Sequence, residues 1–310
     1  MILSEAKPIV LSLKEVNKQF RLLGFTYLFY LICIIILRIY YDDLALYLIK
    51  FINLNYESLL ALILTIGILI IGLLLFKTFK KLNKLTNHKA SDTIKLRKIP
   101  YIQLTVLATA LCLLGTFFTS FFSTIAPLEI TLMFPIGVNI LDFESMNIFL
   151  FILIVIASPI IEEYIFRGVT LRFLGRFSNR FGIISVSLLF SIYHLDFVQL
   201  FPAFILSCFL CLFTLRYKTI VPAIIVRIIT NFILLFLTFI PASNYMYLIV
   251  FIILLYLTAI ITIFTTYKKR VILPYEPDSN LLLKLLFKRF TFIIIFLIII
   301  CFNVYRNFIL

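Results

Sequence analysis

Residues 147–166 have the sequence NIFLFILIVIASPIIEEYIF, a run of apolar side chains that contains two adjacent acids near its end. About 20 predominantly apolar residues are enough for a helix to cross the hydrocarbon core of a bilayer. A helix is the element to expect, because inside a membrane every backbone N–H and C=O must be bonded within the segment. This stretch therefore predicts a membrane-spanning helix with ionisable side chains inside it.

The rest of the chain repeats this apolar pattern. Of its 310 residues, 63% are hydrophobic and 14% are charged, whereas soluble domains are roughly 45–50% apolar. We expect an all-α fold, a polytopic transmembrane helical bundle of about nine spans. We expect this bundle to lie in a cell membrane, the bacterial plasma membrane, where it contacts the lipid bilayer. The predicted spans are residues 21–40, 57–76, 101–125, 147–166, 181–199, 200–216, 219–240, 244–266 and 289–306.

The net charge of +14 would suggest a nucleic-acid partner in a soluble protein. Here the basic residues gather in alternating loops between the apolar runs, so they mark topology and no nucleic-acid partner is expected. The basic loops precede the first span and follow the second, fourth, sixth and eighth. By the positive-inside rule, the N-terminus is cytoplasmic and the C-terminus is outside.

The chain is expected to be organised around one motif-bearing core. Residues 1–20 are expected to form an interfacial amphipathic segment, and residues 21–146 hold the first three spans. The core follows at 147–240, and residues 241–310 hold the last two spans.

A few ionisable side chains lie inside predicted spans, where a charge costs roughly 2.5–3.5 kcal/mol and is normally kept only when it is paired or functional. These residues, with one amide, are Glu162, Glu163, Arg167, His194, Asp196 near a span end, Arg227 and Asn231. Glu163 and Arg167 are spaced i, i+4 and are expected to form an ion pair. Glu162 points about 100° away on the same helix, which leaves it without a local partner. The set is a candidate site.

Pro159 lies just before the acids and cannot donate a backbone hydrogen bond, so it is expected to bend the helix. Counting about 1.5 Å per residue from the predicted cytoplasmic ends puts Glu162 and Arg227 roughly 10 Å inside and His194 near 20 Å. The three side chains then meet only if span 181–199 begins later than predicted or is strongly tilted.

Two short motifs accompany these residues. Residues 162–168 read EEYIFRG, an E-E-x-x-x-R motif, and residues 190–194 read FSIYH, an F-x-x-x-H motif. In this order they resemble the CAAX protease and bacteriocin-processing (Abi) family of intramembrane peptidases. The third motif of that family, H-x-x-x-N, falls on residues 227–231, where Asn231 is present but Arg227 replaces the histidine. The resemblance covers about residues 147–240, less than a third of the chain.

The resemblance implies a membrane-embedded protease that acts on a peptide or protein substrate. By this similarity, Glu162 and His194 activate a water molecule, and Asn231 helps to hold the oxyanion. Glu163 and Arg167 shape the site, and Phe190 supports it as part of the second motif. Arg227 either replaces the missing histidine as an oxyanion donor or binds Glu162 and leaves the site inactive.

The residue types disfavour a metal cofactor. A catalytic zinc ion normally takes three protein ligands, and the chain has two histidines, of which His88 lies in a basic loop. Three ligands could come from Glu162, Glu163 and His194. However, the carboxylates of adjacent helical residues point in different directions, and the positive charge of Arg227 would repel a metal ion. We therefore expect no metal and no other cofactor, with zinc as the disfavoured alternative.

A second class of function stays open. In it the chain is a catalytically inactive family member that acts as a membrane binding, bacteriocin-immunity or scaffold protein and takes a membrane protein as its partner. The intact first and second motifs favour the enzyme, whereas Arg227 favours the inactive protein.

Overall fold

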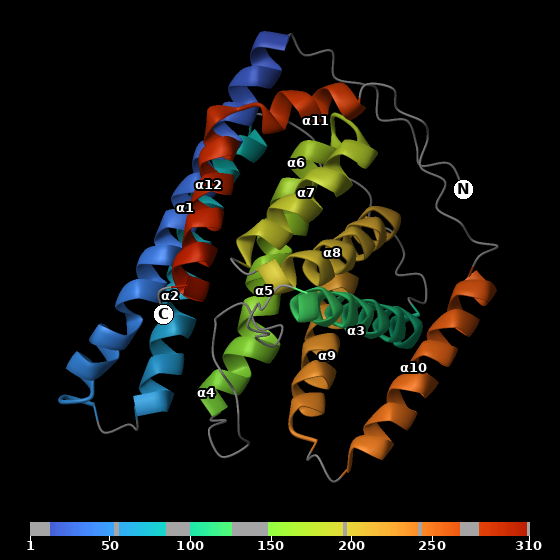
Figure 1. The fold of residues 1–310 in the computed structure, drawn as a ribbon. Coiled ribbons are helices and arrows are strands. Elements are labelled where there is room, and N and C mark those ends of the chain that lie inside the picture. The colour runs from blue at the N-terminus through green and yellow to red at the C-terminus, as the bar shows by residue number, and fades with distance from the viewer. Residues whose placement is uncertain are drawn as a thin grey trace.

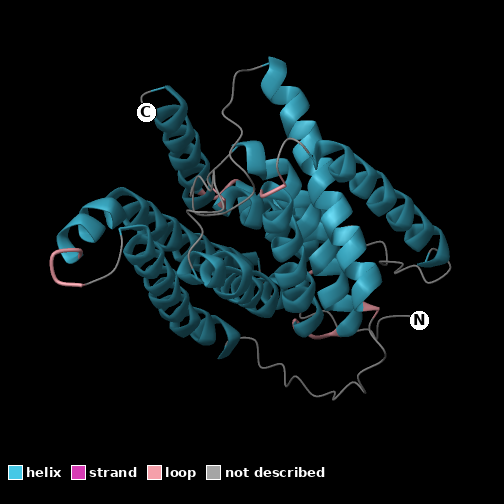
Figure 2. Cartoon of the chain, turned by 90° about the horizontal axis from the view of Figure 1, so that it is seen from below, coloured by secondary structure: helices cyan, strands magenta, loops and turns pink. Residues whose placement is uncertain are grey.

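The computed structural model describes residues 13–52, 56–84, 100–125, 148–194, 197–240, 244–266 and 279–308. Every regular element in these stretches is a helix, and Figure 2 shows helices and no strands among the described residues. The helices are α1 (Leu13–Leu48), α2 (Tyr56–Lys84), α3 (Tyr101–Ile125), α4 (Ile148–Phe151), η2 (Ile152–Ala157), α5 (Ser158–Glu163), η3 (Tyr164–Thr170), α6 (Leu171–Gly175), α7 (Asn179–Tyr193), α8 (Phe197–Tyr217), α9 (Val221–Thr238), α10 (Tyr245–Thr266), α11 (Ser279–Phe287) and α12 (Phe290–Phe308). The predicted all-α fold is confirmed for the described part of the chain.

Within the described residues, five helices are long and apolar enough to cross a membrane, judged by length and composition. They are Lys14–Tyr41, Tyr101–Thr119, Ile148–Gly175, Gln199–Tyr217 and Met246–Phe264. Shorter apolar helices lie at Ser58–Leu74, Asn179–Tyr193, Val221–Leu237 and Phe290–Cys301. Each of these segments overlaps one predicted span, so the helices indicate a multi-pass membrane protein.

The helices form three groups (Figure 1). Helices α1, α2 and α12 run side by side on one flank, and α3, α8, α9 and α10 form the other. The segment from α4 to α7 lies between the two flanks and carries the first two motifs. The largest cluster of buried apolar side chains joins α1 and α12 to this central segment, and Phe20, Phe166, Phe190 and Phe292 are fully buried in it. Packing from both flanks therefore places the motif helices inside the bundle.

The helix that carries the first motif is longer than predicted. The helical run from Ile148 continues through η2, α5, η3 and α6 to Gly175. The predicted end at residue 166 falls just before Arg167, whose charge interrupts the apolar pattern. That end is wrong, because Arg167 is fully buried and paired with Glu163 inside the helix.

The turn between α6 and α7 is tight. Ser178 caps the N-terminus of α7, and its side chain accepts a hydrogen bond from the Phe181 backbone N–H at 3.1 Å. Gly182 lies against the backbone of Gly175, where a Cβ on Gly182 would meet the Gly175 Cα at 2.8 Å. Small residues let membrane helices approach closely, so the helices that carry the first two motifs pack against each other next to this turn.

Helix α7 ends at Tyr193, and the predicted end of that span at residue 199 is wrong. His194 forms the C-cap, and its backbone N–H lies 3.2 Å from the Ser191 carbonyl, the tightened i→i−3 pattern of a helix end. The apolar residues on both sides of this turn make the two helices look continuous in the sequence. Residues 195 and 196 lie outside the described residues.

Helix α1 begins at Leu13, so residues 13–20 of the expected interfacial segment continue into the first span. Residues 1–12 lie outside the described residues. So do His88 and the interhelical segment 267–278.

Candidate active site

Glu162 lies on α5 with 1% of its surface exposed. Its Oε1 accepts a hydrogen bond from the hydroxyl of Ser158, one turn earlier. Its Oε2 pairs with Nη2 of Arg227 on α9 at 3.3 Å. The expectation that Glu162 has no partner on its own helix is therefore wrong. A carboxylate has about four acceptor sites, so these two contacts orient it and leave it able to accept a bond from water.

Glu163 pairs with a different cation, Arg167, one turn later on the same helical run. The Arg167 Nη1 and the Glu163 Oε1 are 2.9 Å apart, and both side chains are fully buried. This is the predicted i, i+4 ion pair, and it is confirmed. Each of the two neighbouring carboxylates thus has its own guanidinium, which offsets the cost of burying four charges.

Phe190 lies where the three motifs meet. The guanidinium carbon of Arg167 is 4.4 Å from the centre of the Phe190 ring, and that of Arg227 is 5.1 Å from it. Cations within about 6 Å of a ring centre are attracted by the ring's electron density. The His194 ring centre is 4.8 Å from the same phenyl ring. Phe190 of the second motif therefore contacts His194 of its own motif and Arg227 of the third. Arg227 in turn pairs with Glu162 of the first motif.

His194 is held in one orientation. Its Nδ1 lies 2.9 Å from the carbonyl oxygen of Phe190. A carbonyl can only accept a hydrogen bond, so Nδ1 carries the hydrogen and the neutral ring presents Nε2 as its acceptor.

Asn231 contacts the backbone of the motif helix. The Ser158 N–H bonds to the Leu153 carbonyl in the i→i−5 register of a π-helix. In that register the next donor would be Pro159, which has no N–H. Nδ2 of Asn231 instead donates to the Ile154 carbonyl at 3.0 Å. One of the two amide hydrogens of Asn231 therefore bonds to the backbone, which leaves the other for a second acceptor.

Glu162 and His194 reach similar depths because the helix that carries Glu162 continues to Gly175. Counting about 1.5 Å per residue from Gly175 and from Asn179 puts both side chains about 20 Å inside. A late start of the second motif's helix, one of the two conditions for such a meeting, does not occur, since α7 begins at Asn179. Helix α9 begins well below the α6–α7 turn in Figure 1, which brings Arg227 near its start to the level of Glu162.

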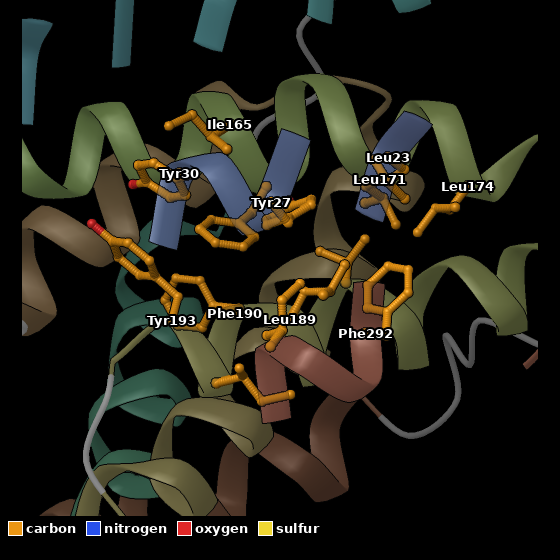
Figure 3. Close-up of a cluster of buried hydrophobic side chains, with 14 of the residues drawn as sticks. Leu23, Tyr27, Tyr30, Ile165, Leu171, Leu174, Leu189, Phe190, Tyr193 and Phe292 are labelled. Carbon is orange, nitrogen blue, oxygen red and sulfur yellow. The ribbon is translucent and has the colours of Figure 1, made fainter. Parts of the chain in front are cut away.

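Two polar side chains near Glu162 were missed by the sequence analysis. Ser158 precedes the acid by four residues, a spacing that places both on one helix face and identifies it as a candidate donor. Tyr30 comes from α1, and no spacing rule connects it to the motifs. Its ring stacks on that of Tyr193 with ring centres 4.9 Å apart and an interplanar angle of 6° (Figure 3).

The donor set does not fit zinc. Among the described residues, no three His, Cys, Asp or Glu side chains form a group that would hold a metal ion. Glu163 faces Arg167, and Nδ1 of His194 faces a backbone carbonyl. Since a catalytic zinc ion normally takes three protein ligands, Glu162, Glu163 and His194 are not arranged as its ligands.

The fold and the site define a membrane helical bundle with a buried acid–base cluster at its centre. Residues 144–233 match the family described as type II CAAX prenyl endopeptidase Rce1-like. The matched segment includes Glu162, His194 and Asn231 and confirms the resemblance inferred from the motifs. It covers less than a third of the chain. No curated protein and no solved structure was found to match the chain.

Proposed function

We propose that this protein is an intramembrane endopeptidase that hydrolyses a peptide bond of a hydrophobic or lipid-modified peptide or protein. The observation that carries the proposal is Glu162, a buried carboxylate held by Ser158 and Arg227 within a segment that matches an endopeptidase family. In a C-a-a-X sequence the cysteine near the C-terminus carries a prenyl chain. The family description therefore points to prenylated peptides as the substrate class.

Glu162 acts as the general base in the proposed reaction. It takes one proton from water while the water oxygen bonds to the carbonyl carbon, and the C=O electron pair moves onto the carbonyl oxygen. When this tetrahedral intermediate collapses, the C=O re-forms and the C–N bond breaks. Glu162 returns its proton to the leaving amine, so one water is consumed and an acid and an amine are produced. Proton transfer of this kind contributes about 10²–10⁴-fold to a rate.

The neighbouring residues orient the reacting groups. Ser158 and Arg227 hold the two oxygens of Glu162. His194 presents Nε2 to the attacking water, because its Nδ1–H is bonded to the Phe190 carbonyl. The second amide hydrogen of Asn231 is available to the oxyanion. Arg167 is a positioning residue, since it lies over the Phe190 ring that also contacts Arg227.

Glu162→Gln tests the proposal. The amide cannot act as a base, so turnover is expected to fall at least about 10²-fold while the protein stays folded. The measurement is hydrolysis of a farnesylated C-a-a-X peptide by purified protein in nanodiscs, with products identified by mass spectrometry. Thermal unfolding checks the fold, and Glu15→Gln, an exposed acid on α1, is the matched control. Parental turnover by Glu162→Gln would sink the hydrolase proposal.

A second candidate function is favoured by one contact, the 3.3 Å pair between Arg227 and Glu162. If the guanidinium holds the carboxylate too tightly for proton transfer, the protein is an inactive family member that binds a membrane protein. In that case neither the parent nor Glu162→Gln hydrolyses the peptide.

A further inference from the structure

Helix α1 lies outside the matched segment 144–233, yet it packs directly on the motif helices. Tyr27 and Tyr30 are three residues apart and face the same side of α1. The Tyr27 hydroxyl lies 2.7 Å from the Thr170 hydroxyl, and the Tyr30 ring stacks on Tyr193. Figure 3 shows both tyrosines of α1 between the motif helix and α7. The first helix of the chain therefore contributes two phenols to the centre of the bundle.

The two phenols differ in what their hydroxyls contact. Tyr27 shares its hydrogen bond with Thr170, which ties α1 to η3. Tyr30 is 2% exposed, and its hydroxyl has no partner in hydrogen-bonding geometry among the described residues. The Tyr193 hydroxyl is near enough for a weak side-chain interaction with it, and the Glu162 carboxylate is near enough to act on it electrostatically. Buried phenol hydroxyls normally have a partner, so this donor points to a group that arrives with a ligand.

A purely structural role explains the Tyr30 ring but not its hydroxyl. The parallel stack on Tyr193 needs only an aromatic face, and phenylalanine supplies that without burying an unpaired polar atom. An unpaired buried hydroxyl costs about 1–3 kcal/mol. The hydroxyl therefore needs an explanation beyond packing.

The donors of the third motif are partly occupied. Nη2 of Arg227 is bonded to Glu162, and Nδ2 of Asn231 is bonded to the Ile154 carbonyl. The histidine expected at position 227 is absent. The Tyr30 hydroxyl lies within electrostatic range of Glu162, and its nearest partner is the Tyr193 hydroxyl, which does not meet hydrogen-bonding geometry. It is therefore a candidate for the hydrogen-bond donor that this motif lacks.

We propose that Tyr30 is a further catalytic residue, whose hydroxyl donates a hydrogen bond to the carbonyl oxygen of the scissile peptide bond. This rests on the proposed function, in which Glu162 activates the water. As water attacks, the C=O electron pair moves onto the oxygen, and the Tyr30 O–H stabilises the resulting oxyanion without losing its proton. When the C–N bond breaks, the C=O re-forms and the Tyr30 hydroxyl is unchanged.

Tyr30→Phe tests the proposal, with Tyr27→Phe as the matched control on the same helix face. Both changes remove a single oxygen. For Tyr30→Phe, kcat on the farnesylated C-a-a-X peptide is expected to fall about 10²-fold with little change in KM, because the hydrogen bond to the oxyanion is much stronger than the bond to the neutral carbonyl of the bound substrate. The unfolding temperature is expected to stay the same or rise. For Tyr27→Phe, the unfolding temperature is expected to fall while kcat per folded molecule is kept.

The outcomes separate this proposal from the function on which it rests. An inactive Glu162→Gln variant together with parental kcat in Tyr30→Phe overturns the role of Tyr30 alone. A Tyr30→Phe variant that loses stability as Tyr27→Phe does, with its activity loss matching the unfolded fraction, also overturns it. No turnover of this peptide by the parent, or parental turnover by Glu162→Gln, counts against both proposals.

Discussion

Phe190 contacts both buried cations of the site, and each cation pairs with a different acid. Arg167 and Arg227 both lie over its ring, yet Arg167 bonds to Glu163 and Arg227 bonds to Glu162. The pairing matters because an unpaired charge at this depth is costly. Glu162 therefore depends on one cation from another helix, and under the proposed function position 227 decides whether Glu162 serves as a base.

Arg227→His is the substitution that tests this dependence. The variant regains the family's third motif but loses the fixed cation at Glu162. Under the proposed function, turnover of the farnesylated peptide is expected to fall about 10-fold or more, a modest part of what acid–base catalysis contributes. The same peptide assay measures it. Loss of one partner of a buried ion pair is also expected to destabilise the fold by about 3–5 kcal/mol, which denaturant unfolding measures.

The control for this variant is Arg172→His, which changes an exposed arginine on the helical run that carries Glu162. It is expected to leave turnover and stability unchanged. A gain of hydrolysis in Arg227→His over an inactive parent has the opposite meaning. It identifies Arg227 as the residue that switches the site off and supports the inactive-protein candidate.

At the scale of the element, the central helix changes its hydrogen-bond register twice around Glu162. The π-helical segments η2 and η3 flank the short α5. In η2 this register leaves the Ile154 carbonyl without a backbone donor, since Pro159 has no N–H. Asn231 on α9 supplies the missing donor. Asn231 therefore links α9 to the segment that carries Glu162, in addition to any contact with a substrate.

This link predicts a coupling between positions 159 and 231. Asn231→Leu is expected to destabilise the fold by about 1–3 kcal/mol, because the buried Ile154 carbonyl loses its donor. Pro159→Ala restores a backbone N–H at the position that faces this carbonyl. The double variant is therefore expected to lose less stability than the sum of the single variants, by about 0.5–3 kcal/mol in a double-mutant cycle. Unfolding of all four proteins in one detergent measures it, and additive effects contradict the link.

The sequence predicted most elements because long apolar runs and their basic flanks are visible along the chain. The predicted span 101–125 coincides with α3 (Tyr101–Ile125). The errors in the predicted helix ends occur where contacts between side chains, which the apolar pattern does not show, determine the structure. Arg167 stays inside its helix because Glu163 neutralises it, and a buried charge looks like a helix end in the sequence.

The Glu163–Arg167 pair of the first motif was predictable because the spacing of the two residues along one helix is local. Arg227 approaches Glu162 from another helix, and its pairing was one of two alternatives left open. Tyr30 was out of reach, since it lies on a helix far away in the sequence and its neighbours are ordinary apolar residues. Contacts between helices of the bundle, unlike those within a helix, follow no spacing rule.

At the scale of the whole molecule, the bundle has two ends with different charge. In Figure 1 the α6–α7 turn and α11 lie at one end, and the turn after α1 and the start of α4 lie at the other. Basic residues of the first end include Arg172, Arg176, Arg180, Lys284, Lys288 and Arg289. The turn after α1 contributes Lys50 alone. By the positive-inside rule, we infer that the end with α11 faces the cytoplasm.

Single cysteines at the two ends test this orientation. Phe51 in the turn after α1 is 72% exposed, and Asn280 on α11 is exposed. In intact bacterial cells, a membrane-impermeant maleimide is expected to label Phe51→Cys at once and Asn280→Cys only after permeabilisation. Neither change alters a charge, so the topogenic signal is kept. The parent is the control for its own free thiols, of which Cys112 and Cys211 are buried.

The reverse labelling pattern would overturn the inferred orientation and also the proposed class of substrate. The helical run that carries Glu162 ends at Gly175, near the α6–α7 turn. Under the proposed function, a substrate made in the cytoplasm approaches the carboxylate from the Gly175 end if α11 is cytoplasmic. If Asn280→Cys is labelled in intact cells and Phe51→Cys is protected, the Gly175 end opens to the outside. Peptides carrying a prenyl group on the cytoplasmic side then lose their direct path to Glu162, and secreted peptides become the substrates that the bundle is oriented to meet.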